Sequence, residues 1–116
     1  MATSFNNTGT FVANAAITAF RLVSISANRG VGLAATASLP DGVAVIDAAS
    51  GDQVTVEFLG GNSVKATLLA GPVTVGDTLF STANGTVAIT GSVTVGKSLT
   101  TASDASAIIE MLPKNI

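Results

Sequence analysis

The sequence has no cysteine, histidine, tryptophan or tyrosine, and charged residues make up only 10% of its 116 positions. Without cysteine there is no disulfide framework, thiol nucleophile or cysteine-ligated metal. Without histidine there is no Ser-His-Asp triad, no imidazole base near neutral pH and no histidine-bound zinc. Five basic residues against seven acidic ones are too few for an electrostatic nucleic-acid interface. We therefore expect no enzymatic activity, no cofactor, no small-molecule substrate and no nucleic-acid partner.

Long apolar runs are also missing. No segment approaches the roughly 20 residues of a membrane-spanning helix, so we expect no membrane partner. The first ten residues, MATSFNNTGT, lack the basic start and the apolar stretch of a secretory signal. A chain of this length is typical of one domain with its own core.

What is present is a largely uncharged surface. Hydrophobic residues form 47% of the chain and the mean hydropathy is +0.61, whereas an ordinary soluble domain carries about 25% charged residues. Thr, Ser, Asn and Ala must therefore cover the outside. Such a surface suits a chain that packs against copies of itself or a partner, although it is also tolerated on ordinary β-sheets.

The pattern along the chain predicts a mainly β fold. Residues 1–16 have no steady period, and we interpret them as an extended N-terminal arm in front of a single β domain over residues 17–116. Short β-favouring segments bounded by turns follow. They indicate a compact antiparallel β-sandwich or β-barrel-like domain of short strands and hairpins. Strands are expected over 17–25, 31–34, 43–46, 53–59, 63–69, 96–100 and 107–112.

Two hairpins are expected. A three-residue loop at 60–62 would oppose Phe58 with Val64 and Glu57 with Lys65, which satisfies both faces of the alternating segments. A second hairpin over 78–90 would turn on Asn84-Gly85 and set Phe80 opposite Ile89. The last segment is compatible with a short helix capped by Ser103, but its paired isoleucines and Pro113 favour a strand.

Two patterns invite a chemical interpretation. Residues 91–98 match the phosphate-binding pattern G-x-x-x-x-G-K-S, but the loop interior is stiff Val-Thr-Val and no helix start follows. A sister copy over 71–79 carries Asp77 in place of Lys97, so we interpret both copies as glycine turns that each feed a strand. Asp47, Ser50 and Asp52 could share a calcium ion, but such residues more often cap turns, and we expect no metal.

A series of short motifs follows in order along residues 17–112. The motifs are Ala19–Ile25, Gly30-Val-Gly32, Leu39-Pro-Asp-Gly-Val-Ala44, Ala49-Ser-Gly-Asp-Gln-Val54, Val75-Gly-Asp-Thr-Leu79 and Gly96-Lys-Ser-Leu99. The series resembles the small capsid decoration, or cement, proteins of tailed bacteriophages. This resemblance implies a β domain made in the host cytoplasm and assembled as a homotrimer on the outer surface of an icosahedral head. There it would clamp neighbouring subunits of the major capsid protein.

Under this resemblance the arm is the expected contact with the capsid. The candidate contact residues are Phe5, Asn6, Thr8, Thr10, Phe11 and Val12. An arm without its own core can add a strand to a partner sheet, so deletion of residues 1–16 is expected to leave the domain folded and to weaken capsid binding. The alternatives are a tail with no role, and a receptor- or glycan-binding β module of a virion appendage. The lack of Trp and Tyr counts against the latter.

Overall fold

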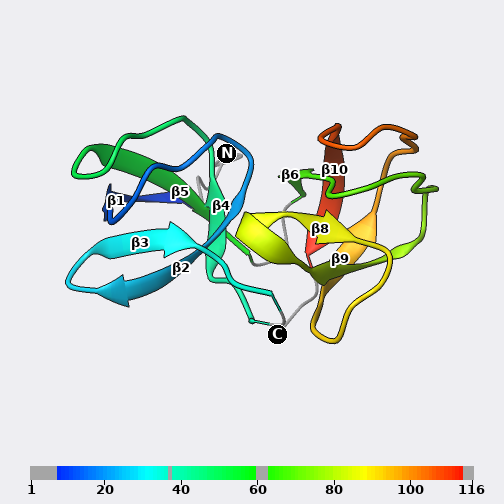
Figure 1. The fold of residues 1–116 in the computed structure, drawn as a ribbon, viewed down its shortest axis with the longest axis horizontal. Coiled ribbons are helices and arrows are strands. Elements are labelled where there is room, and N and C mark those ends of the chain that lie inside the picture. Colours follow the sequence, from blue (N-terminus) through cyan, green and yellow to red (C-terminus); the bar gives the residue numbers. More distant parts are fainter. Residues whose placement is uncertain (1–7, 37, 60–62, 114–116) are drawn as a thin grey trace, which may run out of the picture.

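The computed structural model describes residues 8–36, 38–59 and 63–113, and these form β-strands and one 3-10 turn (Figure 1). The first five strands close into a barrel in the order β1-β3-β2-β4-β5. Their bounds are β1 (Thr8–Ala13), β2 (Leu22–Ala27), β3 (Gly30–Leu33), β4 (Gly42–Ala44) and β5 (Gln53–Phe58). The prediction of a mainly β, barrel-like fold is confirmed.

The remaining strands form a second sheet beside the barrel, in the order β6-β10-β9-β7-β8 (Figure 1). They are β6 (Val64–Thr67), β7 (Thr78–Ser81), β8 (Val87–Ala88), β9 (Thr94–Ser98) and β10 (Ile108–Pro113), with the 3-10 turn η1 (Ala83–Gly85) between β7 and β8. A parallel bridge between Leu68 and Val87 brings the two outer strands of this sheet together. The final segment is thus a strand, as its isoleucines favoured.

The molecule has two cores, and strands of the barrel contribute side chains to both. Alternation along a strand sends neighbouring side chains to opposite faces. In β2, Val23 therefore points into the barrel, while Leu22 packs with the second sheet. Val43 likewise belongs to the second core, and its neighbour Ala44 belongs to the barrel core. The outer wall of the barrel thereby supplies one side of the second core.

β1 corrects the prediction of an arm for residues 8–13, whereas residues 1–7 of that prediction lie outside the described residues. Residues 8–13 are a barrel strand that pairs antiparallel with β5 and, through Val12 and Ala13, parallel with β3. Gly9, Phe11 and Ala13 face inward, and the residues between them face solvent. The sequence pattern did not indicate this alternation because two of the three inward residues, Gly9 and Ala13, are small. Deletion of residues 1–16 would therefore remove a strand of the barrel.

The first predicted hairpin is also wrong. The segments around 53–58 and 64–67 are strands as expected, but β5 pairs with β1 and β4, and β6 pairs with β10. The chain leaves the barrel after β5 and enters the second sheet. Alternation identifies a strand but does not choose its partner, because any neighbour with a matching apolar face satisfies it.

The second predicted hairpin exists with a different register. β7 pairs with β8 so that Phe80 lies opposite Ala88 rather than Ile89. The loop is a three-residue 3-10 turn in which Asn84 (φ 58°) and Gly85 (φ 74°) are left-handed. Thr82 and Thr86 close it, with a backbone hydrogen bond of 2.9 Å and a hydroxyl–hydroxyl distance of 2.9 Å. One more loop residue than expected shifts every pair by one.

Two further predictions differ from the structure in detail. The strand expected from residue 17 begins at Leu22, and Ile17 makes only an isolated bridge with Ala48. The two sequence repeats are not equivalent in structure. Gly76 (φ +95°) is a turn residue, as expected, but Gly96 lies inside β9, opposite Leu79 and Pro113.

Candidate functional site

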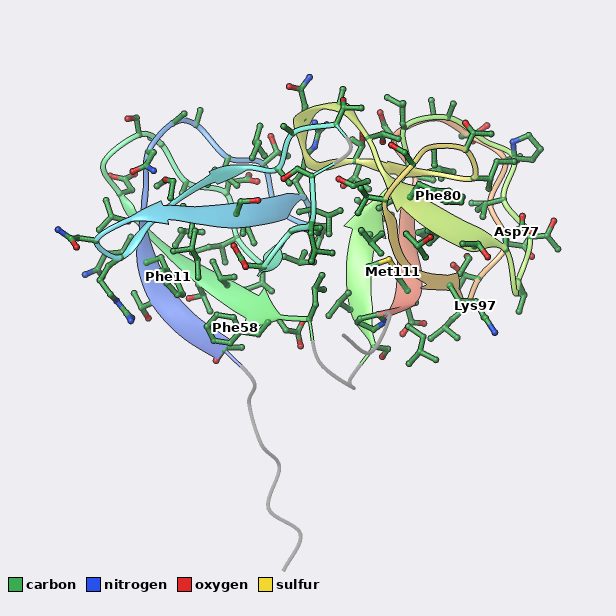
Figure 2. The ribbon with its side chains drawn as sticks, turned by 90° about the horizontal axis from the view of Figure 1, so that it is seen from below. Phe11, Phe58, Asp77, Phe80, Lys97 and Met111 are labelled. Carbon is green, nitrogen blue, oxygen red and sulfur yellow. The ribbon has the colours of Figure 1, made fainter. Side chains whose placement is uncertain are left out.

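Phe11, one of the predicted contact residues, lies inside the barrel. It is 5% exposed, and its ring meets Phe58 edge-to-face with centroids 5.8 Å apart; Figure 2 shows the two rings together. The Arg29 guanidinium lies 4.6 Å from the centroid of the Phe11 ring. Phe11 is therefore a buried residue of the barrel core.

The other predicted contact residues divide into two groups. Thr8, Thr10 and Val12 are exposed on the outer side of β1, whereas Phe5 and Asn6 lie outside the described residues. Arg29 holds β1 in place, because its Nη2 donates to the Thr10 carbonyl at 2.6 Å and its own carbonyl accepts from the Val12 N–H at 2.7 Å. The exposed side of β1 is thus presented on a firmly paired strand.

A groove of about 280 Å³ lies where the barrel meets the second sheet. We call it the inter-sheet groove; it is lined by Phe20, Val43, Val45, Glu57, Ser63, Val64, Lys65 and Glu110. Sequence reasoning missed it because its walls come from residues far apart in the chain. One feature of the sequence did indicate it: Glu57 and Lys65 occupy the outward-facing positions of their alternating segments.

Phe20 forms one wall in an uncommon backbone conformation. Its φ of 65° is left-handed, which is unfavourable for a bulky side chain. Both sheets hold it there: its N–H donates to the Ala44 carbonyl at 2.6 Å, and its carbonyl accepts from the Thr67 hydroxyl at 2.8 Å. Lys65 Nζ lies 5.6 Å from the centroid of the Phe20 ring, within the range of a cation–π contact.

Two further depressions lie on the second sheet. One, of about 350 Å³, shares Lys65 and Glu110 with the inter-sheet groove and continues along Thr100, Thr101, Ile108 and Ile109. The other, of about 280 Å³, is bordered by Thr78, Thr94, Gly96, Lys97, Leu112 and Pro113. The first depression adjoins the inter-sheet groove at Lys65 and Glu110. We call the inter-sheet groove and this depression together the extended groove.

The sequence patterns that suggested chemistry have structural roles. Gly96-Lys97-Ser98 lies in β9, where a paired strand replaces the loop-to-helix turn that cradles a phosphate. Asp77 and Lys97, which occupy matching places in the two repeats, lie at the same end of the second sheet (Figure 2). The repeats therefore build neighbouring strands.

The candidate calcium residues serve as loop contacts. Asp47 Oδ1 accepts the Ala19 N–H at 2.7 Å, and the Ser50 hydroxyl donates to the Asn14 carbonyl at 3.2 Å. Within residues 8–36, 38–59 and 63–113, no three His, Cys, Asp or Glu side chains are grouped to hold a metal ion. In the same part of the chain no helix is long and apolar enough to cross a membrane.

Comparison with solved structures establishes the fold independently. The chain is similar to the crystal structure of the head fiber gp8.5 N base of bacteriophage phi29, with 23% sequence identity and a TM-score of 0.80. The similarity covers 92% of each chain. No curated protein sequence matches the chain.

The sequence itself matches the family model described as phage cement protein over residues 3–113. That range includes every strand of both sheets. The resemblance seen in the ordered short motifs is thereby confirmed. This chain belongs to the phage cement protein family and is a structural protein associated with the phage capsid.

Proposed function

We propose that this protein binds the outer surface of an icosahedral phage head as a homotrimer and stabilises the shell by clamping neighbouring major capsid protein subunits. Family membership supports a capsid partner. The observation that carries the proposal is the exposed apolar surface. Ten aliphatic side chains among the described residues are 39–59% exposed: Val12, Ile25, Leu39, Ile46, Leu69, Val75, Ile89, Leu99, Ile108 and Leu112.

The strand arrangement limits how such a protein can bind. A free strand edge would accept a partner strand, but the barrel is closed, and in the second sheet a bridge between Leu68 and Val87 covers part of the two outer strands. We therefore expect the described part of the chain to contact a partner mainly through side chains on the faces of the sheets. Several copies on one trimer bind at a high effective concentration, so modest contacts add up to firm attachment.

The test uses heads that lack this protein. Purified protein is added, the particles are banded in a density gradient, and the banded copies are counted by quantitative mass spectrometry. We expect copy numbers comparable to the coat protein, and heads that release their DNA at a higher temperature than undecorated heads. Sedimentation of the free protein should give the mass of a trimer. Abundant binding without any gain in head stability would contradict the clamp.

A second candidate is a module of a virion appendage that binds a receptor or glycan. The structural similarity to the base of a head fiber favours it at the level of the fold. A few copies per particle, in place of coat-like numbers, would support this alternative. Absence of the chain from banded particles would contradict both candidates.

A further inference from the structure

We propose that the extended groove is the surface that binds the major capsid protein, and that it takes an extended segment carrying a basic side chain beside an aliphatic one. This inference rests on the proposed function and specifies its contact. Three features of the groove support this binding mode: its apolar wall, its unpaired carboxylates and the two depressions that adjoin at Lys65 and Glu110.

The apolar wall is held rigidly. Phe20 and Val45 are half-buried at the surface of the groove, in front of the fully buried Val43. Two hydrogen bonds, one to each sheet, keep the backbone of Phe20 in its left-handed conformation. Unfavourable backbone conformations that the surroundings enforce are concentrated at binding and active sites. A rigid apolar wall binds an aliphatic side chain without a cost for ordering the wall.

The charges in the groove are unbalanced. Of the five basic and seven acidic residues in the chain, Glu57, Lys65 and Glu110 all line this groove. Lys65 lies opposite Glu110 in the β6–β10 register, yet its ammonium group is placed over the Phe20 ring. Neither carboxylate is hydrogen-bonded or ion-paired to another side chain in the part of the chain that the structure describes. Because the Lys65 ammonium group lies at the Phe20 ring, the two carboxylates have no cationic side chain bound to them among the described residues. The groove is therefore suited to a cationic group on the partner.

The extended groove consists of two adjoining depressions, which gives room for more than one side chain. Lys65 and Glu110 line both the inter-sheet groove and the depression along Ile108 and Thr100. In an extended segment, side chains two residues apart point the same way at a spacing of about 7 Å. One such segment can place an aliphatic side chain against Phe20 and Val45 and a basic side chain between the two glutamates. This arrangement fits an extended polypeptide better than a compact ligand.

The experiment compares two doubly neutralised proteins of equal net charge. Glu57→Gln with Glu110→Gln removes the groove carboxylates. Asp52→Asn with Asp104→Asn removes two exposed carboxylates that line none of the grooves described. Each full-length protein is titrated onto heads lacking the cement protein at low and at physiological salt. Far-UV circular dichroism and thermal unfolding verify that both variants fold.

We expect the groove variant to bind about tenfold more weakly than the control variant at low salt. The affinity of the groove variant should also change less with salt, because a screened attraction has been removed. Val45→Lys, which places a bulky cation on the apolar wall, should weaken binding at both salt concentrations.

Equal binding by the groove and control variants would overturn the inference while leaving the proposed function intact. Failure of the unmodified protein to bind heads would instead overturn the proposed function. If the groove variant loses its trimeric state but, at equal subunit concentration, binds heads as the control does, the groove is a contact between copies of this chain, and the inference is wrong.

Discussion

At the scale of single residues, glycines decide how closely elements can approach. Gly9 faces the barrel interior, and a Cβ there would lie 3.0 Å from the rings of Phe11 and Phe58. The absent side chain therefore makes room for the aromatic pair that fills this end of the barrel. The same reasoning applies to Gly42, where β4 pairs with β5. A Cβ on Gly42 would lie 2.6 Å from the Glu57 carbonyl oxygen.

Replacing Gly42 by alanine is predicted to destabilise the protein by about 1–3 kcal/mol, because the new methyl group can be accommodated only by moving the backbone of β5. The matched control is Gly32→Ala in β3, where nothing lies within 4 Å of the added Cβ. Urea unfolding measures both. Equal midpoints for the two variants would show that β5 yields more easily than the contact distance implies.

At the scale of elements, β1 makes residues 8–13 part of the barrel. Its pairing with β5 runs from Thr8↔Glu57 to Val12↔Gln53, and it also closes the barrel against β3. A strand that closes a barrel protects the edges of both neighbours. Removing it would expose two unpaired edges together with the core around Val54.

Two truncations test this role. A chain that begins at Thr8 keeps every strand pairing described here and is predicted to unfold in one cooperative transition close to that of the full-length protein. A chain that begins at Asn14 lacks β1 and is predicted to lose the cooperative transition of the barrel. Circular dichroism during heating provides the measurement. Indistinguishable melting of the shorter chain and the full-length protein would contradict β1 as a structural strand.

At the scale of the whole molecule, the barrel and the second sheet form one packed unit. The core of the second sheet includes three buried residues from the barrel part of the chain: Leu22, Ala34 and Val43. Hydrogen bonds cross the same boundary, from the Gly85 N–H to the Ala34 carbonyl at 3.0 Å and from the Ser81 hydroxyl to the Ala35 carbonyl at 3.2 Å. Neither sheet can unfold without exposing the apolar surface of the other.

Calorimetry should therefore record a single unfolding transition. Leu22→Ala is predicted to destabilise the protein by about 2–5 kcal/mol, since it removes a fully buried side chain at the boundary, and to lower the midpoint of both sheets together. Leu39→Ala is the control, because Leu39 is half exposed. Two separate transitions, of which Leu22→Ala shifts only one, would indicate that the sheets fold independently.

The sequence by itself determined the class of fold and the local elements. Alternation of apolar with polar residues identified β5 and β6, and the two isoleucines favoured a strand for β10, because these patterns are local properties of a pleated strand. The order of short turn motifs was enough to indicate the phage cement proteins.

Only the tertiary structure decided which strands meet. It set Lys65 opposite Glu110 rather than Glu57 in the strand register, placed Phe11 inside the barrel and made residues 8–13 a strand of the barrel. It also created the extended groove, whose walls come from β4, β5, β6 and β10 and from Phe20. The physical reason is that strand pairing is non-local. Each strand offers the same backbone donors and acceptors, so the partner is selected by how all the apolar faces can be buried at once.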